Sequence, residues 1–337
     1  MGVYDRIGGT SGCKRLAEAL YAGIARDPVL RPFFPGKTLK CAIEEFSAFL
    51  IQFLGGPAEA SQRRRWLHLG ESHRRFPIGA RERKAWLKHM SAAIDSLAVD
   101  DAARAELHAF FAHASAGLVN QGVSPEAPLI GRGELARRWS NQLEVHRAIE
   151  AIRSGDAEGA IAAVSNIAVS DSVRCGLLAQ MLHARTPAMT QYVHDSVRRS
   201  PDLVRTRYYS RTLLHTAAAL GLAETVQVLL ASGADPNGGH HQPLYSLANE
   251  YGGSGGGQIV RMLVAAGADV NACDNVKRCT ALHMAARRDH VEIAGALLDC
   301  GADIDARDTN GATPLRRAVN TRQRAVADLL RSRGGGL

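Results

Sequence analysis

Residues 72–78 read Ser-His-Arg-Arg-Phe-Pro-Ile and place one imidazole, that of His73, shortly before two large apolar side chains. Phe76 follows the histidine by three residues and Ile78 follows it by five. This spacing predicts a histidine beside an apolar surface. The segment is flanked on both sides by stretches of helical periodicity, and these define the first domain.

We predict four helices around this segment, over about 12–26, 42–53, 80–97 and from 101 onward. The second has one apolar face at i, i+4, i+7, i+8 and i+11, formed by Ala42, Phe46, Phe49, Leu50 and Phe53. Thr10 or Ser11 is the expected N-cap of the first helix, and Asp27-Pro28 is its expected end.

Aromatic residues concentrate in the same region. All eight Phe lie between Phe33 and Phe111, and residues 1–120 hold 12 aromatics against 6 in the remaining 217 residues. The sequence therefore predicts an all-α domain with inward-facing aromatic rings and a nearby histidine. A haem requires an apolar slot and an imidazole ligand of this kind.

Residues 1–120 resemble a truncated haemoglobin, and within that family its second group. The resemblance covers the whole predicted domain and depends on several motifs in order. These are Tyr4-Asp5-Arg6-Ile7-Gly8-Gly9, Leu20-Tyr21, Asp27-Pro28-Val29-Leu30, Phe33-Phe34-Pro35, Gly55-Gly56-Pro57, the His73 segment, and Ala85-Trp86-Leu87-Lys88-His89-Met90.

The resemblance implies haem b (iron protoporphyrin IX) with His73 as the proximal iron ligand. It implies that Tyr21 and Trp86 stabilise a distal ligand through hydrogen bonds. The implied cofactor-binding residues are Phe34, Phe46, Phe49, Phe76 and Ile78.

Two positions depart from the family pattern. Phe34 stands where many relatives have a polar Tyr or His, and Ala42 stands where many globins have a distal His. Alternatives remain at the other positions: His68 is a rival ligand, and Tyr21 and Trp86 could be core residues with local backbone partners.

A second pattern begins after a boundary segment rich in Gly and Pro, residues 121–134. Gly-Ala-Asp recurs at Gly233, Gly267 and Gly301, with a spacing of 34 residues. Each copy follows a Thr-x-Leu-His-like element, and these copies resemble ankyrin repeats, whose period is about 33 residues. Each of these glycines is expected to end a helix in a left-handed turn.

We therefore predict four segments: a globin domain over 1–120, a linker over 121–134, a helical cap or degenerate ankyrin repeats over 135–210, and ankyrin repeats over 211–337. The glycine-rich run 252–257 is expected to be a flexible loop rather than a phosphate loop, since no Gly-Lys-Ser/Thr follows it. His240 and His241 are expected at solvent-exposed hairpin tips.

The composition and charge indicate which partners, which cysteine state and which cellular location to expect. The net charge of +8 is divided between the two parts (17 − 12 = +5 in residues 1–120, 24 − 21 = +3 in the rest), which argues against a nucleic-acid partner. Six scattered cysteines without a CxxC pair indicate reduced thiols. No apolar run approaches the ~20 residues of a membrane span, and no signal peptide is evident, so we expect a cytoplasmic protein.

Three functional hypotheses follow. The first is a haem protein that binds dioxygen or another diatomic gas and engages a protein partner through ankyrin repeats. The second is a haem enzyme, a peroxidase or a nitric-oxide-consuming oxygenase. The third is a scaffold whose globin domain has lost its haem. The joint presence of His73, Tyr21 and Trp86 argues against the third, and the absence of a distal acid–base His favours the first.

Overall fold

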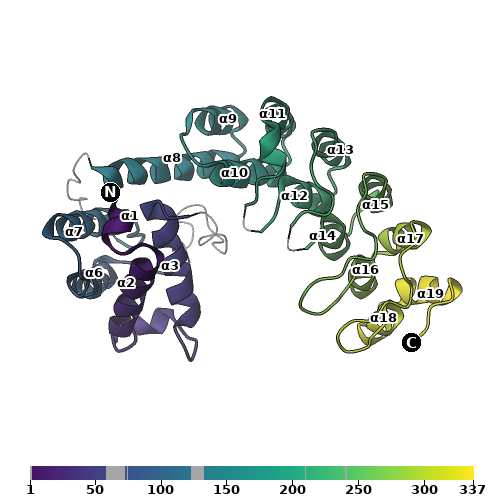
Figure 1. Cartoon of the computed structure of the whole chain (residues 1–337), viewed down its shortest axis with the longest axis horizontal. Coiled ribbons are helices and arrows are strands. Elements are labelled where there is room, and N and C mark those ends of the chain that lie inside the picture. Colours follow the sequence, from purple (N-terminus) through teal and green to yellow (C-terminus); the bar gives the residue numbers. More distant parts are fainter. Residues whose placement is uncertain (1, 58–72, 74, 123–132, 209, 240) are drawn as a thin grey trace. The chain divides into compact units, whose positions relative to one another are not determined.

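The computed structural model describes residues 2–57, 73, 75–122, 133–208, 210–239 and 241–337. These residues form helices and two isolated antiparallel bridges, and they contain no strand. They divide into two compact units, 1–150 with 162–169 and 151–161 with 170–337 (Figure 1). The predicted all-α fold class is therefore confirmed. No helix among the described residues is long and apolar enough to cross a membrane.

The first unit is a helical assembly around one hydrophobic core. Its elements are α1 (Val3–Arg6), α2 (Gly9–Ile24), the 3-10 helix η1 (Arg31–Phe33), α3 (Lys40–Leu54), α6 (Ala80–Asp95), α7 (Asp101–Ala116) and most of α8 (Glu134–Ser154). Helix α2 packs against both α3 and α6, and α6 packs against α7. The core includes Leu16, Leu20, Phe53, Ile94 and Phe110.

The start of α2 differs from the prediction. Gly8 is the N-cap, with φ of 90°, so Thr10 and Ser11 lie inside the first turn and their predicted capping role is wrong. Only a residue without a Cβ adopts this backbone readily. The helix also ends at Ile24, three residues before Asp27, whose carboxylate instead accepts hydrogen bonds from the Val29 and Leu30 amides.

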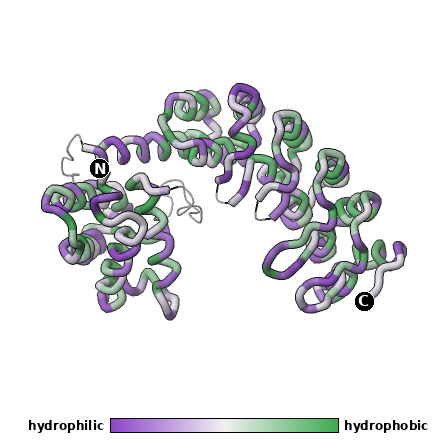
Figure 2. Tube along the Cα trace, viewed as in Figure 1, coloured by the Kyte–Doolittle hydropathy of each residue, from purple (hydrophilic) through white to green (hydrophobic). Residues whose placement is uncertain are grey.

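The second unit is a stack of helix pairs. Its helices are α9 (Ala157–Asn166, which contributes to both units), α10 (Asp171–Ala184), α11 (Pro187–Arg199), α12 (Leu213–Leu220), α13 (Ala223–Ala231), α14 (Pro243–Glu250), α15 (Gly256–Ala265), α16 (Ala281–Arg288), α17 (Val291–Asp299), α18 (Pro314–Asn320) and α19 (Arg324–Ser332), with the 3-10 helix η2 (Pro201–Val204). The first helices of consecutive pairs, α12, α14, α16 and α18, pack in series. Hydrophobic residues recur along the helices of both units (Figure 2).

The repeated motifs make repeated contacts. Gly233, Gly267 and Gly301 have φ of 86°, 96° and 90°, which confirms the predicted left-handed turns. Asn271 then joins neighbouring repeats: its side-chain amide donates to the Gly301 carbonyl at 3.3 Å, and its side-chain oxygen accepts from the Asp303 amide at 2.7 Å. Asn237 makes the same pair of bonds one repeat earlier. Each Asn therefore connects its own repeat to the next.

The glycine-rich run is more ordered than predicted. Gly256 and Gly257 are buried and form the first turn of α15, so the predicted flexible loop is wrong for the last two residues of the run. The carboxylate of Glu292 on α17 accepts hydrogen bonds from the Gly255 and Gly257 amides at 2.9 and 3.1 Å. A Cβ on Gly256 would lie 2.7 Å from Ile293 Cγ1, so close helix packing is the physical reason for glycine here.

The prediction for the adjacent histidines is also corrected. His241 is half-buried and stacks on Tyr245, with ring centroids 4.9 Å apart, and its carbonyl accepts a hydrogen bond from His215 Nε2. This ring packing explains why His241 is not an exposed tip. His240 lies outside the described residues.

Candidate functional site

The segment after His73 is tied to the C-terminal end of α7. The Phe76 amide donates to the His73 carbonyl at 3.0 Å, and the Asn120 side-chain amide donates to the Phe76 carbonyl at 2.8 Å. The Asn120 side-chain oxygen accepts from the Ile78 amide at 2.9 Å, while the Ile78 carbonyl accepts from the Asn120 and Gln121 amides. These bonds fix the backbone that carries His73 without using its imidazole.

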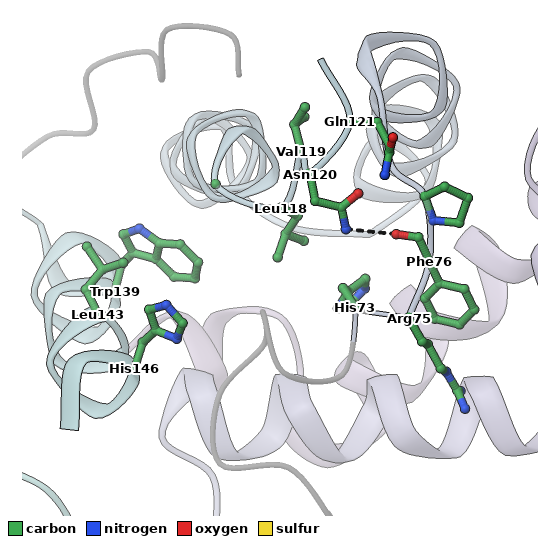
Figure 3. Close-up of a pocket in the computed structure, with 12 residues that line it drawn as sticks. His73, Arg75, Phe76, Leu118, Val119, Asn120, Gln121, Trp139, Leu143 and His146 are labelled. Carbon is green, nitrogen blue, oxygen red and sulfur yellow. Dashed lines mark hydrogen bonds between the residues drawn. The ribbon is translucent and has the colours of Figure 1, made fainter. Parts of the chain in front are cut away.

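A cavity of about 500 Å³ lies beside this segment (Figure 3). His73 and Phe76 form one side, and Trp139 and His146 of α8 face them from the other. The remaining lining residues are Arg75, Pro77, Gly117, Leu118, Val119, Asn120, Gln121 and Leu143. The walls thus combine apolar surface with a nearly equal share of polar surface, and two imidazoles are among them.

An aromatic cluster adjoins this cavity. The ring of Tyr21 contacts those of Phe34 and Phe46, with centroids 5.5 and 6.2 Å apart. Phe111 contacts both Phe46, at 6.4 Å, and Trp86, at 5.8 Å, so Tyr21 and Trp86 belong to one connected cluster. Phe76 is shared by both features, because its ring lies 6.2 Å from that of Phe34 and it also lines the cavity.

Local contacts position Tyr21, Phe34 and Trp86. The Arg31 guanidinium donates to the Phe34 carbonyl and, at 2.8 Å, to the Gly36 carbonyl, which fixes the turn after η1. His89, one turn after Trp86 in α6, bonds Asp27 at 2.7 Å and thereby joins α6 to the turn that follows α2. Asp27 has a pKa below its usual value, chiefly because of this bond.

Close packing at one glycine brings α2 and α6 together. A Cβ on Gly23 would lie 2.4 Å from His89 Nδ1, so a larger residue would displace the His89 ring that bonds Asp27. Tyr21 lies two residues before this contact and Trp86 three residues before His89, so the approach brings their two helices together near both side chains.

The two predicted hydrogen-bond donors, Tyr21 and Trp86, carry a proton and have no acceptor among the described residues. Burial raises the pKa of the Tyr21 phenol, with a further contribution from the Glu45 carboxylate, so the hydroxyl stays protonated. Within the described part of the chain, neither the Tyr21 hydroxyl nor the Trp86 indole N–H has a hydrogen-bond partner. Both residues are only partly buried, and donors of this kind find a partner when a bound group buries them.

These observations test whether the residues fit a haem. Aromatic walls, an imidazole beside a cavity and two donors without a protein acceptor suit a flat apolar group whose metal takes a small polar ligand. Among the described residues no three His, Cys, Asp or Glu side chains gather into a metal-binding group. The residues therefore fit this cofactor.

The structure brings most of the predicted site residues together. His73, Phe76, Phe34, Phe46, Tyr21 and Trp86 lie in the cavity wall or the adjoining cluster. Phe49 is 3% exposed and stacks between Phe46 and Phe53, deeper in the core. Ile78 is outside the cavity lining and is held through its backbone. The rival ligand His68 lies outside the described residues, and the individual roles remain predictions.

Sequence reasoning missed the contribution of α8. Leu135, Trp139, Leu143 and His146 follow one another at spacings of four, four and three residues, a helical stripe that could have been recognised directly after the boundary segment. The sequence predicts a helical cap or degenerate ankyrin repeats over 135–210, whereas residues 135–150 pack with the first unit.

Comparison with protein families identifies both parts of the chain. Residues 2–117 match the family described as bacterial-like globin. Residues 209–239 match the ankyrin repeat, and residues 244–335 match a model of three ankyrin copies. The predicted domain boundaries between these matches remain a prediction.

Relatives of both kinds are found among known proteins. The group 2 truncated hemoglobin YjbI of Bacillus subtilis is 30% identical over 107 residues, which cover 32% of this chain and 80% of that protein. Group 2 truncated hemoglobin 3-1 of Lotus japonicus is 37% identical over 81 residues, covering 24% of this chain and 48% of that protein. The human cyclin-dependent kinase 4 inhibitor B is 33% identical over 122 residues, covering 36% of this chain and 87% of that protein.

The match to other relatives is partial. This chain spans 18% of the length of the bovine mitochondrial disaggregase, to which it is 37% identical over 122 residues, 36% of this chain. Among solved structures, the hemoglobins of Chloroflexus aurantiacus and Thermobifida fusca are 39% and 41% identical. Each match covers 36% of this chain, 99% and 98% of those chains respectively, with TM-scores of 0.34.

Proposed function

Because its first domain belongs to the group 2 truncated haemoglobins and ankyrin repeats follow it, we propose that this globin-type haem protein binds a diatomic gas at a haem held by His73. We propose dioxygen as the first candidate ligand and haem b as the cofactor. The ankyrin repeats would bind a protein partner. A cytoplasmic location is part of the same proposal.

One observation carries the proposal. Tyr21 and Trp86 offer an O–H and an N–H in one connected aromatic cluster, and neither has a hydrogen-bond acceptor among the described residues. Once a bound cofactor buries these donors, leaving one of them unpaired would cost about 1–3 kcal/mol. An acceptor bound beside them would recover this cost, and a partially charged diatomic ligand is a small acceptor of that kind.

The chain's own residues would have three tasks. A haem bound here would supply an iron centre able to take a diatomic ligand. His73 holds the cofactor through its imidazole, Tyr21 and Trp86 donate hydrogen bonds toward the ligand, and Phe34, Phe46 and Phe76 exclude water. Phe34 keeps the approach to Tyr21 apolar, since it replaces the polar residue that many relatives have there.

An absorption spectrum of the full chain after addition of haemin tests the proposal. We expect a Soret band that saturates at one haem per chain, and its loss in His73→Ala. His108→Ala is the matched control, because His108 pairs with Asp95 on a partly exposed face of α7.

The control should bind haem as the wild type does. A wild-type chain without a saturable band, or a His73→Ala variant with an unchanged spectrum, would contradict the proposal. Sustained turnover of peroxide or nitric oxide by the same preparation would favour the enzyme hypothesis instead.

A further inference from the structure

One wall of the His73 cavity comes from outside the globin match. The bacterial-like globin match ends at residue 117, whereas α8 begins at Glu134. Helix α8 nevertheless contributes Trp139, Leu143 and His146 to the cavity lining (Figure 3). These three side chains face His73 and Phe76 from the opposite side.

The helix is anchored to the globin core and not merely laid against it. Trp139 is 6% exposed, and its ring meets that of Phe110 edge-on at a centroid distance of 5.7 Å. Leu135 is fully buried in the same core, and Glu134 accepts a hydrogen bond from the Val3 amide at 3.3 Å. These contacts fix the orientation of the next two turns of α8, which carry Leu143 and His146 into the cavity lining.

These two turns carry one exposed apolar side chain, that of Leu143. Leu143 is 38% exposed and is one of five large hydrophobic residues exposed in the described part of the chain. Unlike the other four, it lines the cavity, which is about 500 Å³ in volume. An apolar side chain left open to a cavity of this size favours an apolar occupant, since burial of such surface is stabilising.

The opposing walls specify that occupant further. Phe76 and Leu118 provide apolar surface across from Leu143, and an imidazole stands on each side, at His73 and His146. A planar aromatic macrocycle with a metal centre uses both kinds of group. A wholly aliphatic ligand would use only the apolar part of this lining.

We propose that α8 is a structural part of the haem chamber, with Leu143 and His146 in contact with the bound haem. This inference rests on the proposed function, because it assumes that haem occupies the chamber beside His73. It extends the site beyond the globin domain to a helix that the globin family does not supply.

The rate of haem loss from the full chain tests this inference. Haem-bound protein is mixed with an excess of a haem-scavenging apoglobin, and the transfer is followed by absorbance. The Leu143→Ala/His146→Ala double variant should lose haem about ten-fold faster, as expected from the loss of a buried aliphatic contact. The matched control is Glu144→Ala/Arg147→Ala, which removes an exposed i,i+3 ion pair from the same helix.

Hydrogen exchange gives a second readout on the unmodified chain. Haem binding should slow exchange of the amides over 139–146, because a filled chamber holds α8 more firmly. Equal rates of haem loss in both double variants and the wild type, or unchanged exchange in α8, would overturn the inference. A wild-type chain that takes up no haem would instead overturn the proposed function, so the two failures are distinguishable.

Discussion

At the scale of single residues, two buried histidines each join one ankyrin repeat to the next through hydrogen bonds of the imidazole. His215 Nδ1 accepts a hydrogen bond from the Thr212 amide at 3.1 Å, and Nε2 donates to the His241 carbonyl. His283 repeats the arrangement with the Thr280 amide and the Ala312 carbonyl. Nδ1 can accept only when it carries no proton, so both rings must be neutral.

This requirement predicts a pH dependence of stability. Burial lowers the pKa of His215 to about 4, below the unfolded value of about 6.5. The unfolded chain therefore binds more protons between these values, so stability is complete above about pH 6.5 and falls as the pH drops toward 4. The loss from this residue is on the order of 3 kcal/mol.

Urea unfolding of the full chain by circular dichroism, at pH 7 and pH 5, measures this effect. His215→Gln should be less stable than the wild type at pH 7 and should lose less stability on acidification. An identical pH dependence in His215→Gln and wild type would show that His215 does not titrate on unfolding.

A second residue-scale prediction concerns Trp86. Trp86→Phe keeps an aromatic ring against Phe111 but removes the indole N–H. Since a hydrogen bond to a charged acceptor is worth roughly 1.5–3 kcal/mol, dioxygen should leave the reduced haem protein about ten-fold faster or more. Stopped-flow measurement of dioxygen release checks this. Tyr4→Phe, which removes an exposed hydroxyl bonded to Thr10, should leave release unchanged. Unchanged release in Trp86→Phe would remove Trp86 as a donor.

At the scale of elements, two glycines in adjacent helices occupy opposite environments. Gly256 begins α15 against Ile293, where a Cβ would lie 2.7 Å from Cγ1. Gly295 lies within α17, where the nearest atom to a Cβ would be Leu329 Cδ2 at 4.0 Å. The same substitution should therefore have opposite effects at the two positions.

Gly256→Ala should destabilise the repeats by about 1–3 kcal/mol because the helices must separate. Gly295→Ala should stabilise them by about 0.5–1 kcal/mol, since alanine restricts the unfolded chain and favours helix. Thermal unfolding of both variants gives the comparison. A neutral Gly256→Ala would contradict the packing of α15 on α17, and a destabilising Gly295→Ala would contradict the open space beside Gly295.

At the scale of the whole molecule, periodicity made most of the fold predictable. The 34-residue spacing of the Gly-Ala-Asp motif and the aromatic stripe of α3 depend on local pattern, which a sequence displays directly. The N-cap at Gly8, the order of Gly256 and Gly257, and the stacking of His241 depend on contacts with residues distant in sequence or on backbone conformation. The cavity-facing role of α8 depends on distant residues in the same way, because Phe110, the ring partner of Trp139, precedes it by 29 residues (139 − 110) and His73 lies still earlier.

The sharing of α8 has a practical consequence for dividing this chain into fragments. Leu135 and Trp139 belong to the core of the first unit, whereas Ala151 and the rest of the last turn belong to the second. A cut before Gly133 would strip a globin fragment of its Trp139 packing. A cut after Ser154 would give the repeat fragment a frayed beginning. No single cut point therefore preserves both parts of the chain. For biochemical work, the globin fragment and the repeat fragment should overlap so that both contain α8.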